Sequence, residues 1–196
     1  MKQLFLTPII FIAACGSATD PAPEALYFER LSGLCNGEAY AGKLVSDDAV
    51  DADFKTANMI MGPATCDGLT VRIPFAVDED RSRTWVITRT QDGLRLKHDH
   101  RHEDGSEDAL TQYGGDSTPG GTAGQQDYPV DEETRTLFIA QEIEVSTQNT
   151  WTVEIDPNET FSYQMSRPER LFRVEFDLTM PVDAPPPPWG VAPIAE

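Results

Sequence analysis

The chain has 196 residues, of which 39% are hydrophobic, and its 33 acidic and 15 basic residues give a formal net charge of -18. This acidic balance argues against nucleic-acid binding and against contact between the protein surface and anionic lipid, because both partners are themselves negatively charged. The length is sufficient for one domain with a substantial hydrophobic core.

The first residues predict an export signal followed by a lipid anchor. One lysine precedes an apolar run that is too short to span a membrane, and small residues follow it. The sequence IAAC, which ends at Cys15, resembles the lipobox of bacterial lipoproteins. The resemblance implies removal of residues 1–14 as a signal peptide and acylation of Cys15. Gly16 in the next position then implies the outer membrane, so we expect a lipoprotein that faces the periplasm of a Gram-negative bacterium.

The segment after the lipobox predicts a tether, a helix and a disulfide. Residues 15–23 are small and polar with two prolines, which is typical of a flexible tether. Apolar residues near helical spacing over 24–34 predict one short helix. With Cys15 assigned to lipid, Cys35 and Cys66 remain, and two cysteines in an oxidising compartment predict one structural disulfide.

Beyond residue 37 the pattern is that of β-strands. Apolar and polar residues alternate, and turn signals such as Asp67-Gly68 and Asp92-Gly93 separate the runs. The alternating runs cover residues 69–77, 84–88, 94–102, 151–155, 161–165 and 172–178. We therefore predict an all-β domain over residues 24–182, a single antiparallel up-and-down β-barrel of roughly ten strands. The pattern resembles lipocalins and other calycins, and a β-sandwich is the alternative.

Two segments interrupt or follow the predicted strands. Residues 114–126 are rich in glycine and predict a mobile loop, either a lid over one barrel end or a disordered insertion. Residues 183–196 contain four consecutive prolines followed by Trp189, which predicts an extended polyproline tail.

The stretch LRLKHDHRH holds every histidine of the chain, His98, His100 and His102, at alternate positions. In a strand these side chains share one face, which begins with the apolar Leu94 and Leu96 and is therefore expected to point inward. Two-residue turns at Asp92-Gly93 and Asp104-Gly105 would place further residues on the same inner layer. The candidate ligand-binding residues on this layer are Trp85, Arg89, Thr111 and Tyr113.

The histidines also suggest a metal site. Imidazoles and a carboxylate on adjacent strands are suitable ligands for zinc, copper or iron, and we expect His100, His102 and Glu107 to converge, with His98 beside them. Together with Gly93 and Gly114, this triple resembles the first motif of cupins, a resemblance that implies a cupin-like fold as a further alternative. The other interpretation is a polar, solvated hairpin without a metal.

The hairpin pair RTWVITRTQDGLRLKHDHRHEDGSEDALTQYGG and the strand RLFRVEFDL resemble those of a group of uncharacterised secreted proteins of Gram-negative bacteria. The resemblance implies fold and compartment but no activity. Two hypotheses on function follow. One is a lipid-anchored, non-enzymatic binding protein with a small molecule or metal ion inside the barrel. The other is a metal-dependent enzyme that uses His100, His102 and Glu107.

Overall fold

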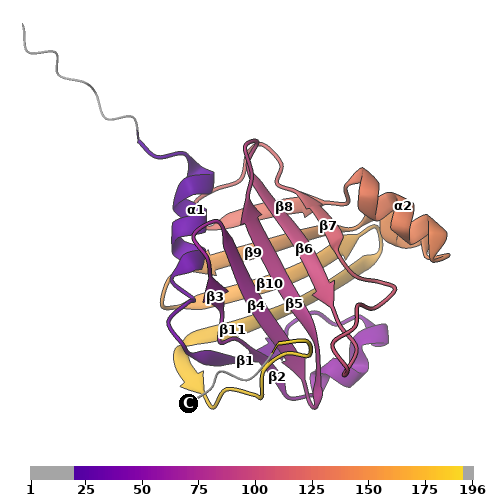
Figure 1. Ribbon diagram of the computed structural model, residues 1–196, viewed down its shortest axis with the longest axis horizontal. Coiled ribbons are helices and arrows are strands. Elements are labelled where there is room, and N and C mark those ends of the chain that lie inside the picture. Colours follow the sequence, from indigo (N-terminus) through magenta and orange to yellow (C-terminus); the bar gives the residue numbers. More distant parts are fainter. Residues whose placement is uncertain (1–19, 192–196) are drawn as a thin grey trace, which may run out of the picture.

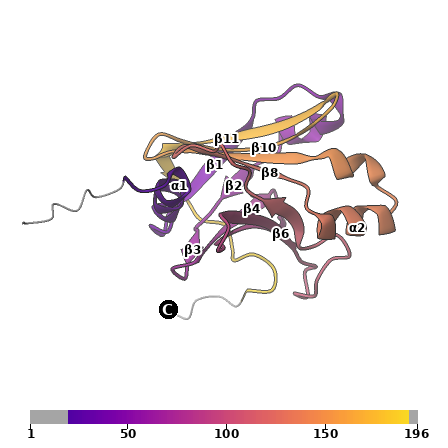
Figure 2. The ribbon, with the colours of Figure 1, turned by 90° about the horizontal axis from the view of Figure 1, so that it is seen from above.

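The computed structural model describes residues 20–191, which form one mostly β structure (Figures 1 and 2). Its helical segments are α1 Pro23–Ser32, η1 Ala49–Lys55, α2 Glu132–Ala140 and η2 Glu144–Gln148. Its strands are β1 Ala39–Leu44, β2 Met59–Met61, β3 Thr65–Cys66, β4 Thr70–Val77, β5 Asp80–Arg89, β6 Leu94–His100, β7 Tyr113–Asp116, β8 Gln125–Pro129, β9 Thr150–Asp156, β10 Thr160–Arg167 and β11 Arg170–Val182. The predicted lipidation site Cys15, the signal peptide 1–14 and most of the tether lie outside the described residues.

The strands follow one another around the sheet in the order β7-β6-β5-β4-β2-β1-β11-β10-β9-β8, and all pairs are antiparallel. β3 pairs with β4 alone. Figure 2 shows β10 and β11 on one side of the interior and β4 and β6 on the other. The predicted antiparallel up-and-down barrel with a short N-terminal helix is therefore confirmed, and two 3-10 helices and α2 are added to it.

The two end strands of this order, β7 and β8, are linked by hydrogen bonds along a seam. The Asp131 N–H donates to the Gly114 carbonyl at 3.1 Å, and the Thr118 N–H donates to the Asp127 carbonyl at 3.1 Å. These two bonds fall in one antiparallel register, so the barrel is nearly closed. A Cβ at Gly115 would overlap the Pro129 carbonyl, so glycine permits the close approach of the two chains here.

The alternating patterns of the sequence place the core inside the barrel. In β4, β9 and residues 172–178 of β11, alternate apolar side chains are buried and the side chains between them are mostly more exposed, as the period of a strand requires. Helix α1 covers one end, where Tyr27 and Leu31 are fully buried and the Tyr27 hydroxyl donates to the Val153 carbonyl at 3.2 Å. Helix α2 lies on the opposite side of the molecule (Figure 1).

Local chemistry positions α2 beside the seam. The Asp131 carboxylate accepts the Thr134 N–H at 2.8 Å as an N-cap, and the Lys97 ammonium on β6 lies 2.9 Å from the same carboxylate. The Thr134 hydroxyl accepts the Gly114 N–H at 2.7 Å. These contacts hold the start of α2 against β6 and β7.

The disulfide, the glycine-rich segment and the proline-rich tail were also predicted from the sequence. Cys35 and Cys66 form the predicted disulfide, with 6.0 Å between their Cα atoms. The loop predicted over residues 114–126 is shorter and covers residues 117–124, because β7 and the start of β8 occupy its two ends. The part of the proline-rich tail that the structure describes lies along β5, where Arg81 Nη1 donates to the Pro187 carbonyl at 2.8 Å.

Candidate functional site

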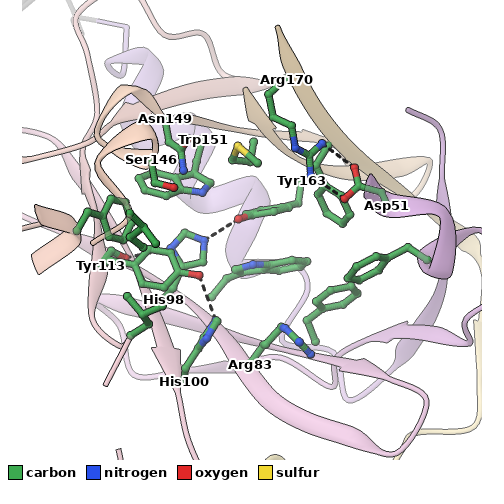
Figure 3. A pocket seen from close by; sticks show the side chains of 18 residues that line it. Asp51, Arg83, His98, His100, Tyr113, Ser146, Asn149, Trp151, Tyr163 and Arg170 are labelled. Carbon is green, nitrogen blue, oxygen red and sulfur yellow. Dashed lines mark hydrogen bonds and ion pairs between the residues drawn. The ribbon is translucent and has the colours of Figure 1, made fainter. Parts of the chain in front are cut away.

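A cavity of about 360 Å³ lies in the barrel, bounded by inward strand residues and by η1, α2 and η2 (Figure 3). Eight aromatic side chains form most of its wall: Phe54, Phe75, Trp85, Tyr113, Phe138, Trp151, Tyr163 and Phe172. The polar lining residues are Asp51, Arg83, His98, His100, Ser146, Asn149 and Arg170. The remaining wall is aliphatic or thioether, from Leu110, Ile143 and Met165.

His98 is a buried, neutral histidine whose ring nitrogens both have partners. Nδ1 lies 3.0 Å from the Tyr113 carbonyl, and Nε2 lies 2.7 Å from the Tyr163 hydroxyl. Because a carbonyl only accepts, Nδ1 carries the proton and Nε2 accepts from Tyr163. Burial lowers the pKa of His98 to about 3. The imidazole therefore joins β6, β7 and β10 through hydrogen bonds.

His100 is the inward histidine closer to solvent. Its Nε2 lies 3.3 Å from the Tyr113 hydroxyl, and its backbone N–H donates to the Thr111 hydroxyl at 2.9 Å. Burial, followed by the positive charge of Arg83, lowers the pKa of His100 to about 4. His100 is therefore neutral at pH 7 and offers one ring nitrogen toward Tyr113.

His102 lies outside the cavity lining. Strand β6 ends at His100, and the Asp104-Gly105 turn leaves the His102 side chain 57% exposed, with Nδ1 3.9 Å from Asp108. Glu107 is also exposed, and its carboxylate lies 3.2 Å from Arg101 Nη2. The structure thus brings His98 and His100 together, with ring centroids 6.4 Å apart, and holds Glu107 in a separate ion pair.

Within residues 20–191 no group of three or more His, Cys, Asp or Glu side chains is placed to hold a metal ion. Zinc, copper or iron ligation by His100, His102 and Glu107 stays a prediction from the sequence. Elemental analysis of the chain from residue 16, purified without an affinity tag, tests it. One equivalent of metal that is lost in His100→Ala would support the site.

The predicted ligand-binding residues divide into two pairs. Trp85 and Tyr113 line the cavity. Thr111 stands behind His100 as a hydrogen-bond acceptor. Arg89 follows Trp85 and Ile87 on the same face of β5, but it lies at the exposed end of the strand, where its guanidinium is 4.7 Å from the centre of the Phe28 ring and outside the cavity lining.

The register of the histidine hairpin explains these differences. The two-residue turn predicted at Asp92-Gly93 would pair Ile87 with His98, but β5 and β6 instead pair Trp85 with His98 and Arg83 with His100. A shift by two residues keeps every side chain on its predicted face. The shift places Arg83, which was not among the residues predicted for the inner layer, opposite His100 in the cavity wall.

Arg170 and Asp51 close the cavity wall on the η1 side. Arg170 Nη1 and Nη2 each lie 2.6 Å from an Asp51 carboxylate oxygen, and Nη1 lies 2.9 Å from Asp48. Asp51 is only 4% exposed, so this bidentate pair fastens η1 to the start of β11. Sequence reasoning missed it because the two residues are far apart in the chain.

The fold and the cavity define a β-barrel that could bind a small ligand. No family model, no curated protein and no solved structure matches the chain. Among the described helices, none is both long enough and apolar enough to cross a membrane.

Proposed function

We propose that this chain is a lipid-anchored periplasmic binding protein that holds a small, largely apolar molecule inside its barrel. The observation that carries the proposal is the aromatic cavity of about 360 Å³. Small-molecule sites commonly have volumes of roughly 300–1,000 Å³, apolar walls and a few polar groups that orient the ligand.

The wall and the volume of the cavity both support this proposal. Its aromatic rings support one another, since Trp85 stacks on Tyr163 with centroids 4.4 Å apart and on Phe75 at 4.8 Å. Rings held in this way offer a rigid apolar surface at low entropic cost. An apolar cavity of about 150 Å³ is large enough for benzene, so this cavity suits a larger molecule.

The compartment and the anchor rest on different residues. The disulfide between Cys35 and Cys66 suits an oxidising compartment, and the lipobox at Cys15 supplies the anchor. Labelling of cells with a radioactive fatty acid tests this part. We expect incorporation into the wild-type chain, none into Cys15→Ser, and label that fractionates with the outer membrane. An unlabelled wild-type chain would refute the anchor.

Binding is tested with the neutral fluorescent probe N-phenyl-1-naphthylamine and the chain from residue 16, which retains every described residue. Ser146 lines the cavity, so the larger side chain of Ser146→Phe should fill it and weaken the binding of the probe at least about tenfold. Val145 is 56% exposed beside it, and Val145→Phe is the matched control that should bind as the wild type does. Equal affinity in the wild type and Ser146→Phe would refute binding in the cavity.

A further inference from the structure

The charge of the cavity wall differs from that of the whole molecule. The chain carries a formal net charge of -18, yet the charged residues of the wall are Arg83, Arg170 and Asp51, besides two neutral histidines. Arg170 is neutralised by its pairs with Asp51 and Asp48. Arg83 differs because its aspartate partner, Asp80, does not line the cavity, so Arg83 is the cationic group that the wall presents, and a low-dielectric wall strengthens its charge toward the interior.

Arg83 has donors beyond those that its ion pair uses. A guanidinium has five N–H donors, and Nη1 of Arg83 lies 2.6 Å from Asp80 Oδ2. The Arg83 side chain is 29% exposed, so it is partly desolvated but still able to meet a ligand. The positive charge of Arg83 acts within the cavity, because, after burial, it contributes most to the lowered pKa of His100.

Arg83 and His100 form one polar edge of an otherwise aromatic cavity. They are direct partners across β5 and β6, and the Tyr113 hydroxyl lies 3.3 Å from His100 Nε2. Figure 3 shows Arg83 and His100 on the same side of the cavity, with Tyr113 next to His100. A guanidinium, an imidazole and a phenol together can bind the oxygens of an acidic group.

We infer that the cavity takes an organic anion with a planar apolar body, whose acidic group lies against Arg83, His100 and Tyr113. The inference rests on the proposed binding function and specifies its ligand class. The body lies between aromatic walls, and the acid makes a charge-assisted hydrogen bond with the guanidinium.

Binding of such an anion is coupled to a proton. An anion beside His100 favours the imidazolium, so binding raises the pKa of His100. Binding is then accompanied by proton uptake, and the affinity for the anion increases as the pH falls. The other charged and titratable groups around His100 are Arg83 and Asp80 on β5, Asp99 and His98 on β6, Asp108 in the following turn and Tyr113 on β7. These groups are present in both the free and the bound protein, so the ligand charge causes the change.

A matched pair of probes tests the ligand class. 8-Anilinonaphthalene-1-sulfonate has the body of N-phenyl-1-naphthylamine with one added sulfonate, which stays ionised across the accessible pH range. The dissociation constants of both probes are measured by fluorescence with the wild type, Arg83→Gln, Arg83→Lys and the control Arg95→Gln. Arg95 is a strand arginine that is also paired with one aspartate, Asp116, but it is exposed on the outside of β6.

We expect the sulfonate to bind more tightly than the neutral probe in the wild type. Arg83→Gln should weaken the sulfonate by about tenfold to a hundredfold, as expected when hydrogen bonds to a charged group are lost, and leave the neutral probe within about twofold. Arg83→Lys should retain most of the sulfonate affinity, and Arg95→Gln all of it. Lowering the pH from 7.5 to 5.0 should decrease the dissociation constant of the sulfonate probe by at least about twofold in the wild type, but not in His100→Gln.

The outcomes separate the ligand class from the binding function. If the neutral probe binds as tightly as the sulfonate and Ser146→Phe removes both, the barrel binds ligands but the anion inference is wrong. An equal loss of both probes in Arg83→Gln, with Arg83→Lys no better, gives Arg83 a purely structural role and also overturns it. If neither probe depends on Ser146→Phe, the binding function itself fails.

Discussion

Replacement of His98 by glutamine should remove a defined part of the pH dependence of stability. The imidazole is fully enclosed, with Nδ1 donating to Tyr113 and Nε2 accepting from Tyr163. Glutamine has a donor and an acceptor but does not titrate. His98→Gln therefore tests the proton separately from the packing.

The magnitude follows from the pKa of His98, which burial lowers from 6.5 to about 3. Between these values the unfolded chain binds a proton that the folded chain rejects, so stability is complete above pH 6.5 and is lost as the pH falls. At pH 5.5 this loss is about 1.4 kcal/mol for His98. His100, whose pKa is lowered to about 4, should lose a similar amount over the same window, because only its unfolded form titrates there.

The assay is urea unfolding followed by tryptophan fluorescence at pH 7.5 and 5.5, with the disulfide intact. Both values lie above the usual range of Asp and Glu, so their titration contributes little. The decrease in the free energy of unfolding should be about half as large in His98→Gln as in the wild type. His102→Gln removes an exposed histidine and is the control, which should follow the wild type. Identical pH dependence in the wild type and His98→Gln would refute a neutral, enclosed His98.

Three further changes test the framework around the cavity. Cys35→Ser with Cys66→Ser should lower the free energy of unfolding by roughly 3–4 kcal/mol, because the bond closes a loop with a sequence separation of 31 residues; urea unfolding measures it. Gly115→Ala should open the β7–β8 seam, lower the melting temperature and accelerate amide exchange at Gly114 and Asp131, whereas unchanged exchange would contradict the seam. Asp51→Asn should cost roughly 3 kcal/mol, because it leaves Arg170 partly unpaired beneath η1, and thermal unfolding compared with the exposed-site change Asp47→Asn checks this.

The sequence predicted the barrel because its strands are amphipathic over most of their length. Trp85, His98 and Tyr113 point inward as expected, since alternation alone assigns faces. Turn lengths were less certain, and the four residues from Thr90 to Gly93 moved the pairing by two positions. That shift conserves faces, so the expected inner layer was largely right while the partner of His100 was missed.

The third histidine shows where alternation stops being informative. His102 continues the pattern, but the strand ends before it, because Arg101 pairs with Glu107 and the chain turns at Gly105. Whether a polar residue near a hairpin tip is inside or outside depends on where the ladder ends, which a local pattern does not encode. The predicted convergence of His100, His102 and Glu107 assumed a longer ladder.

The helical side of the cavity was beyond local reasoning for another reason. The cap of α2, Asp131, is a recognisable start signal, but the helix is short and its apolar spacing is weak. Asp51 and Phe138 reach the cavity only because η1 and α2 dock on the barrel. Their roles depend on contacts between segments that are distant in the chain.

The position of β11 has a consequence for the order of events during synthesis. This strand pairs with β10, its hairpin partner, and with β1, which was made about 130 residues earlier. The earlier strand pairs and the β7–β8 seam connect segments that precede β11, but β1 has no partner on its second edge before residues 170–182 emerge. A chain still attached to the ribosome therefore cannot close its barrel, and release of the C-terminal strand permits the β1–β11 pairing that completes it.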